Sequence, residues 1–185
     1  MMDRRDFMKS SAMTAAGISL FPAGCASEFV APPPPLFKVS LAQWSLHRAL
    51  FANEMTNLEF PVIAREAFGI NGVEYVNAFM KEEARDPRYI QELKGICDAE
   101  GVTSVLIMCD GEGRLGDPDA EARTTAIENH YRWIDVAVEL GCHSIRVNAA
   151  SEGDWNTQRD LAADGLSRLT EYGEQANINV IVENH

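Results

Sequence analysis

Basic residues are scarce in this sequence of 185 residues, which has 16 Lys and Arg against 28 Asp and Glu and a net charge of −12. Residues 1–25 carry three of the basic and two of the acidic side chains, so the remainder has 13 against 26 and a net charge of −13. A surface this acidic repels the phosphate backbone of nucleic acids and anionic membrane surfaces. We therefore expect no nucleic-acid partner.

Cysteine is also scarce, with four residues in the chain. Beyond residue 25 they are Cys97, Cys109 and Cys142, an odd number without paired spacing. Cys109 is predicted to end one strand and Cys142 to begin another, so they would lie at opposite ends of a parallel sheet, too far apart for a disulfide. We interpret all three as small apolar core residues, with Cys109 the only one near a candidate site.

The N-terminal segment lacks a hydrophobic run long enough to span a bilayer. Arg4 to Lys9 reads RRDFMK, a twin-arginine pattern, and Ser10 to Phe21 is short and weakly apolar. Pro22 to Cys25 resembles a lipoprotein cleavage box in which Pro22 replaces the expected Leu, so lipidation of Cys25 and plain cleavage nearby both stay open. We predict that residues 1–25 are a twin-arginine signal peptide, and that the protein is exported and either periplasmic or a membrane-anchored lipoprotein.

Residues 26–35 are predicted to be a Pro-rich linker. They end in Ala31 to Pro35, APPPP, and consecutive prolines hold an extended conformation without donating backbone hydrogen bonds. The folded part is therefore expected to occupy residues 36–185.

The folded part repeats one pattern, an apolar β-branched run followed by a helix, which is typical of parallel βα units. The predicted strands are Phe37–Gln43, Gly72–Val76, Val102–Cys109, Ser144–Asn148 and Ile178–Glu183. The predicted helices are Asn57–Phe68, Pro87–Glu100, Asp117–Leu140 and Asn156–Ala176. Strand starts recur roughly every 35 residues, so eight units need about 280. We predict an α/β fold, a (β/α)8 TIM barrel truncated here to about five βα units.

An open, doubly wound sheet is the alternative, because five parallel strands also suit a Rossmann-like order. Gly111 to Gly116 matches G-x-G-x-x-G between a strand and a helix. However, the helix is predicted to start after the third glycine, and Asp110 and Glu112 put negative charge where a phosphate would lie. We interpret this string as a loop over the barrel mouth.

The last predicted strand ends in a carboxylate and an imidazole. Ile181, Glu183 and His185 share one face because side chains alternate along a strand. Burying Glu183 there is costly unless a cation or a donor meets it. A neighbouring Arg or Lys is the structural alternative to a functional partner, and His185 could simply be solvated.

Further polar and aromatic residues are expected at the barrel mouth. Glu74 suits a catalytic role and a structural salt bridge about equally well. Asn148 and Arg146 are suited to hydrogen-bond the hydroxyl groups of a ligand, and Arg146 is equally suited to balance an interior carboxylate. Trp44 and His47 follow the first strand, where an aromatic ring could stack on the apolar face of a ligand.

Three strand motifs carry a family resemblance in their order and spacing. They are Lys38–Trp44 (KVSLAQW), Gly72–Val76 (GVEYV) and Val180–His185 (VIVENH). Together they resemble the sugar phosphate isomerase/epimerase family, the xylose-isomerase-like TIM barrels. The resemblance implies a divalent metal (Mn, Mg, Co or Zn) held by a Glu at the end of strand 5, which Glu183 matches, with the other ligands from strands 6 to 8. It also implies substrate contact by the His two residues later, which is His185.

The resemblance implies an exported metal-dependent sugar isomerase or epimerase that acts by proton transfer through an enediolate, incomplete as given. Its partner would be a small sugar or polyol. Membrane association would come only through a lipid on Cys25, and an oligomer is compatible with this reading. The alternatives are an exported sugar-binding barrel without catalysis and the endonuclease branch of the superfamily, which the net charge of −13 and the 4 His disfavour.

Overall fold

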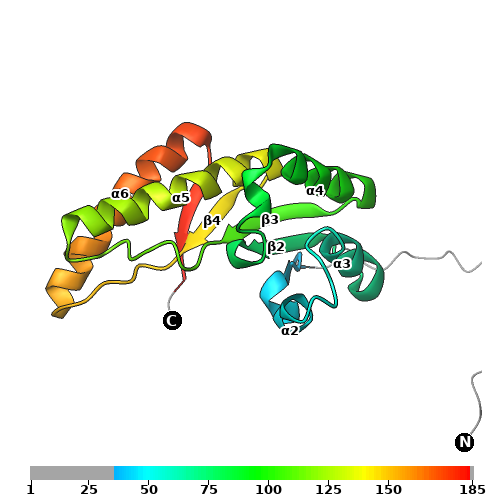
Figure 1. The fold of residues 1–185 in the computed structure, drawn as a ribbon, viewed down its shortest axis with the longest axis horizontal. Coiled ribbons are helices and arrows are strands. Elements are labelled where there is room, and N and C mark those ends of the chain that lie inside the picture. Colours follow the sequence, from blue (N-terminus) through cyan, green and yellow to red (C-terminus); the bar gives the residue numbers. More distant parts are fainter. Residues whose placement is uncertain (1–35, 184–185) are drawn as a thin grey trace, which may run out of the picture. The chain divides into compact units, whose positions relative to one another are not determined.

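The computed structural model describes residues 36–183, which form a parallel sheet with helices packed against it (Figure 1). The predicted signal peptide, the linker, Cys25 and His185 lie outside the described residues. The strands are β1 (Leu41–Ala42), β2 (Gly72–Val76), β3 (Thr103–Met108), β4 (Ser144–Val147) and β5 (Asn179–Val182). The α-helices are α2 (His47–Phe51), α3 (Phe60–Phe68), α4 (Pro87–Glu100), α5 (Ala120–Leu140) and α6 (Trp155–Ala176), and the short 3-10 helices are η1 (Gln43–Leu46), η2 (Asn77–Phe79) and η3 (Glu83–Arg85).

The strands lie in the sheet in the order in which they occur in the chain, and every neighbouring pair is parallel. Val76 pairs with Met108, Met108 with Arg146 and Arg146 with Ile181. A doubly wound sheet would reverse its strand order at a switch point. The sequential order is that of a barrel wall, so the prediction of a partial TIM barrel is confirmed and the Rossmann-like alternative is wrong.

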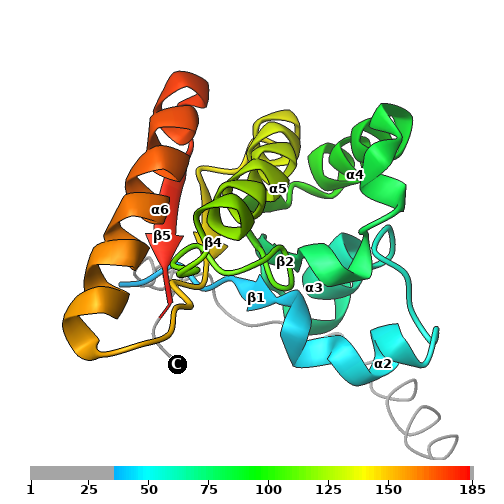
Figure 2. The same ribbon diagram turned by 60° about the vertical axis from the view of Figure 1, so that its left-hand side comes forward.

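One face of the sheet packs against the helices. Helices α4, α5 and α6 follow one another along this side (Figure 2). Tyr75, Ile107 and Ile145 on this face are completely buried and share one apolar core with Leu93 of α4 and Trp133 of α5. Burial of each large side chain contributes about 1.5–3 kcal/mol relative to exposure, so this core supplies most of the driving force for the fold. Cys97, Cys109 and Cys142 are buried and unbridged, as predicted.

Capping residues set the helix boundaries. Helix α4 has the predicted bounds, because Asp86 accepts a hydrogen bond from the backbone N–H of Arg88 and Gly101 adopts φ 64° just after the last turn. Helix α5 starts at Ala120 and not at the predicted Asp117. Asp119 is its N-cap and accepts a hydrogen bond of 2.7 Å from the N–H of Ala122.

The first strand is much shorter than predicted. It covers only Leu41–Ala42, where the chain pairs with Val73 and Glu74 of β2, and Phe37 is 79% exposed. At Gln43 the backbone turns into η1 and α2, which the sequence pattern did not reveal. In residues 36–183 no helix has both the length and the apolar character needed to cross a membrane.

Candidate functional site

Every described strand is followed within two residues by a polar side chain. These residues are Gln43, Asn77, Asp110, Asn148 and Glu183. Because all the strands are parallel, their carboxyl ends meet at one edge of the sheet, the edge that carries the active site in TIM barrels. This rim is therefore the candidate functional site.

Arg146 is the centre of the rim. Its Nη1 lies 2.9 Å from Oδ1 of Asp110, and its Nε lies 2.8 Å from Oε2 of Glu183. The second contact is an ion pair and not a directed hydrogen bond, because Nε of Arg146 has no hydrogen-bond partner among the described residues. Arg146 is 11% exposed, whereas Asp110 is 42% and Glu183 49% exposed. A largely buried cation thus lies between two half-exposed carboxylates that a ligand can reach.

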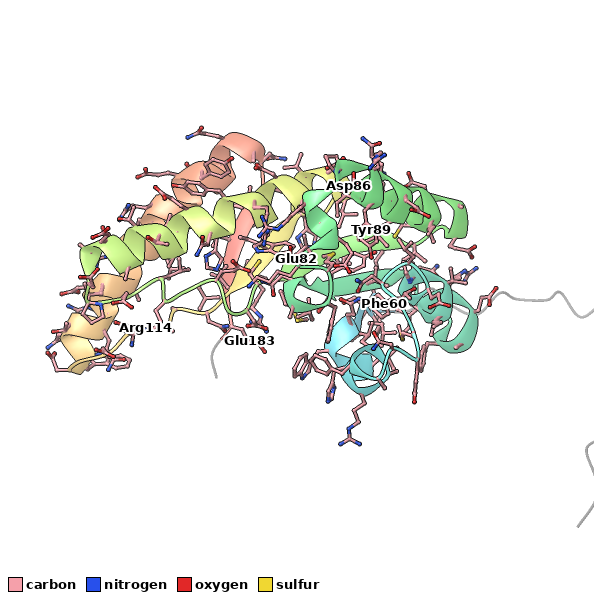
Figure 3. The ribbon with its side chains drawn as sticks, in the orientation of Figure 1. Phe60, Glu82, Asp86, Tyr89, Arg114 and Glu183 are labelled. Atoms are coloured by element: carbon pink, nitrogen blue, oxygen red, sulfur yellow. The ribbon has the colours of Figure 1, made fainter. Side chains whose placement is uncertain are left out.

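Asn148 completes this polar cluster. Its Nδ2 donates a hydrogen bond of 2.6 Å to Asp110, and its Oδ1 accepts one of 3.3 Å from Arg146. Figure 3 shows Glu183 just beyond the end of β5, with Arg114 on the loop that follows β3 at the same end of the sheet. Three adjacent strands, β3, β4 and β5, therefore each contribute to one group of donors and acceptors.

Buried amides hold the strand ends in place beneath this cluster. Asn77 is fully buried; it accepts a hydrogen bond from the N–H of Asp110 and donates to the carbonyl of Asp110 and to Oε1 of Glu112, each at 2.9 Å. Gln43 is also fully buried and accepts a hydrogen bond of 2.9 Å from the N–H of Val76. A buried amide with satisfied partners is rigid, so Asn77 determines where Asp110 projects.

The structure brings together three of the residues predicted from the sequence, Glu183, Arg146 and Asn148. Glu183 forms an ion pair with Arg146, which is the structural alternative that the sequence left open for it. Glu74, on β2, accepts a hydrogen bond from Ser40, and within residues 36–183 it forms no salt bridge, so a catalytic or substrate-binding role for it stays a prediction. Glu74 is not joined to the Arg146 cluster.

Trp44 and His47 form an aromatic cluster over the first strand. The two rings stack with centroids 4.8 Å apart, and Trp44 also stacks on Phe79 at 6.0 Å. Nδ1 of His47 donates to the carbonyl oxygen of Trp44 at 2.7 Å. Trp44 remains 49% exposed, so part of its ring stays open for a ligand.

Sequence reasoning missed Asp110 and Asn77 as members of the site. In the sequence Asp110 stands out only as a charge that disfavours a phosphate beside the glycine string, and Asn77 is one polar residue after an apolar strand. The signal that identified Asn148 and Glu183, a polar residue at the end of a buried strand, applies to both. Their importance depends on hydrogen bonds between strands, which no spacing within one strand displays.

Cys109 lies next to the cluster but is not a reactive group. Burial raises the pKa of its thiol well above the ordinary value, and the neighbouring Glu112 and Asp110 raise it further. The thiolate is the nucleophilic form, so this cysteine stays protonated and inert.

The described residues do not by themselves form a metal site. No group of three or more His, Cys, Asp or Glu side chains in residues 36–183 is placed to hold an ion. Glu183, the predicted ligand, has Arg146 as its cationic partner. Metal binding therefore stays a prediction that rests on Glu183.

Comparison with solved structures shows a shared fold at low identity. Zinc-bound IolI protein superposes with a TM-score of 0.63 at 12% identity, covering 79% of this chain and 51% of that one. D-psicose 3-epimerase from Clostridium cellulolyticum gives 0.57 at 14%, covering 78% and 51%. The E. coli 3-keto-D-glucoside 4-epimerase YcjR gives 0.53 at 19%, covering 63% and 47%. The chain spans about half the length of these structures.

Two family models match the sequence, and the search of curated proteins returned no match. The twin-arginine translocation signal matches residues 1–21, which supports export by that route. The second model matches residues 62–185, well over half of the chain. With its sequential parallel strands and polar rim, this chain belongs to the xylose isomerase-like TIM barrel family.

Proposed function

We propose that this chain is the substrate-binding and proton-transferring part of an exported sugar isomerase or epimerase. The observation that carries the proposal is the cluster of Asp110, Arg146, Asn148 and Glu183 at the carboxyl ends of three adjacent strands. Family membership supports it, as do the names of two structural neighbours, both of which are sugar epimerases.

The cluster suits a polyhydroxylated ligand. Asp110 offers acceptor oxygens, and Asn148 and Arg146 offer donors, so adjacent hydroxyl groups can be bound in pairs. Trp44, and the stacked His47, would contact the apolar face of the sugar ring from the first strand. Glu74 and His185 remain proposed substrate contacts.

Glu183 is the proposed catalytic carboxylate. It would remove the proton from the carbon next to the sugar carbonyl, leaving an enediolate, and in an isomerisation return it to the adjacent carbon on the same face. Inversion of the first carbon would need a second carboxyl group as proton donor on the opposite face, which the family resemblance assigns to the later strands. The ion pair with Arg146 orients this carboxylate, and the Glu183 side chain stays 49% exposed, so substrate can reach it. A divalent metal (Mn, Mg, Co or Zn) remains a prediction, for which the described residues supply Glu183 alone as a ligand.

A second candidate is an exported sugar-binding barrel without catalysis. The ion pair of Arg146 with Glu183 favours it, because it gives this carboxylate a structural partner within the described residues. The endonuclease branch stays disfavoured by the acidic charge. Export into the periplasm, with or without a lipid on Cys25, would bring the chain into contact with extracellular sugars, whether it acts as an enzyme or as a binding protein.

The test is exchange of substrate hydrogen with solvent. The protein, with and without added divalent metals, would be incubated with ketoses and aldoses in D2O, and deuterium would be sought at the carbon next to the carbonyl. We expect Glu183→Gln to abolish exchange and Glu174→Gln, an exposed change on α6, to leave it intact. Tight sugar binding without any exchange would instead establish the binding protein, and neither binding nor exchange would overturn both candidates.

A further inference from the structure

A hollow of about 430 Å³ lies beside the loop that follows β3, and its lining residues Gly111 and Glu112 directly follow Asp110 of the rim cluster. Its walls carry the basic residues Lys81, Arg85 and Arg132 and the acidic residues Glu112 and Glu128. Lys81 and Arg85 flank Glu82, which Figure 3 labels, and Arg132 comes from α5. Three of the 13 basic residues beyond residue 25 thus meet at one place in a chain of net charge −12.

Two of these cations have donors to spare. Nζ of Lys81 lies 3.3 Å and Nη2 of Arg132 lies 3.9 Å from the same oxygen of Glu112, which is 6% exposed and also accepts a hydrogen bond from Asn77. Within the part of the chain that the structure describes, neither cation makes a hydrogen bond. An ammonium has three N–H donors and a guanidinium five, so one shared carboxylate oxygen leaves most of them without an acceptor.

The guanidinium group of Arg132 is oriented by the ring of Trp133. Its Cζ lies 4.5 Å from the ring centroid of Trp133, and this indole is completely buried. Stacking on the ring fixes the plane of the guanidinium and leaves its edge free to bind. The side chains of Arg132 and Lys81 are 27% and 44% exposed, so their donors are accessible from the hollow.

We propose that this hollow is a binding site for a tetrahedral oxyanion, a phosphate taken as the free ion or as the end of a phosphomonoester. Such an anion offers several acceptor oxygens at once, and charge-assisted hydrogen bonds to Lys and Arg are the strong ones. It would compete with Glu112 for Lys81 and Arg132. The loop glycine Gly111 borders the hollow, but the cations come from other elements, so the site is not a dinucleotide fold.

Calorimetric titration of the full chain with inorganic phosphate and with glycerol 3-phosphate, at constant ionic strength, tests this proposal. We expect saturable binding with a dissociation constant below about 1 mM for at least one of them. Tighter binding of glycerol 3-phosphate would identify the monoester as the ligand, and tighter binding of phosphate the free ion. Trp133 fluorescence should change along the same isotherm, and Trp133→Phe should remove that change.

Four variants make the test decisive. Lys81→Met and Arg132→Met should each weaken binding at least about tenfold, whereas Lys94→Met, which removes an exposed pair with Asp98, should not. Glu112→Gln should strengthen binding several-fold, because it removes the internal competitor and keeps an acceptor for Asn77. This gain is readable even if a Met variant fails to fold. Absence of saturable binding in both the native chain and Glu112→Gln would overturn the proposal, as would equal affinities in all variants.

Discussion

The two faces of the sheet differ although the same strands build both. On the helix side Ile107, Ile145 and Tyr75 are apolar or aromatic and completely buried. On the opposite side, Arg146 and Glu183 form a charged pair. Ile145 and Arg146 are neighbours in the chain, yet one belongs to the core and the other to the candidate site. Because side chains alternate along a strand, one residue can stabilise the core while the next one in the chain belongs to the candidate site.

The largest expected effect comes from opening a cavity on the helix side. Ile145→Ala should lower the free energy of unfolding by about 2–5 kcal/mol, because it removes a completely buried side chain. Ile181 lies on β5 and belongs to the opposite face of the sheet, where it is 40% exposed. Ile181→Ala should therefore lower the free energy of unfolding by less than about 1 kcal/mol. Urea unfolding of both variants measures the difference. Equal losses would mean that the two faces contribute alike to stability.

A second contrast lies within the helix layer. A Cβ at Gly165 of α6 would lie 1.8 Å from the carbonyl oxygen of Leu115, so Gly165→Ala should destabilise the fold by about 1–3 kcal/mol. A Cβ at Gly95 of α4 would meet nothing within 4 Å, so Gly95→Ala should stabilise it by about 0.5–1 kcal/mol. Thermal and urea unfolding measure whether each substitution raises or lowers the free energy of unfolding. A neutral Gly165→Ala would show that the loop at Leu115 moves away freely.

Substitutions on the charged face should change the free energy of unfolding only slightly. Arg146→Met should change the free energy of unfolding by about 1 kcal/mol or less, because Asp110 and Glu183 are half exposed and remain solvated. Arg159→Met, which removes an exposed pair with Asp160, is the matched control. If the proposed function holds, only Arg146→Met weakens sugar binding. A stability loss above about 3 kcal/mol would instead place Arg146 in the core.

The smallest effect is a pH dependence from the helix side. Burial lowers the pKa of His130 below its ordinary 6.5, although its hydrogen bond to Ala126 and the nearby Glu112 oppose this. The unfolded chain then binds the proton more readily, so stability is full above about pH 6.5 and is lost as the pH falls below it. His130→Gln should flatten the loss between about pH 7.5 and about pH 5.5 in urea unfolding. An unchanged slope would show that His130 is not its source.

Local pattern predicted most of the fold. The bounds of β2 and α4 match the prediction, because an apolar strand run and the helical spacing of apolar residues are signals within one segment. The first strand did not follow its pattern. Its apolar residues before Leu41 find no partner among the described residues, and pairing with β2 decided its length.

The site was predicted only in part, for the same reason. Glu183, Asn148 and Arg146 stand out because polar residues end apolar runs. The role of Asp110 depends on Arg146, 36 residues later, and that of Asn77 on Asp110, 33 residues later. Such contacts depend on strand order, which residue spacing does not encode.

By itself, the sequence determined the acidic charge, the export signal and the succession of βα units, because composition and periodicity are local properties. Only the tertiary structure decided that the strands stand in sequential order, that Arg146 lies between Asp110 and Glu183, and that Lys81 and Arg132 converge beside Glu112. These arrangements join residues far apart in the chain, and only packing of helices on a twisted parallel sheet brings them within contact distance.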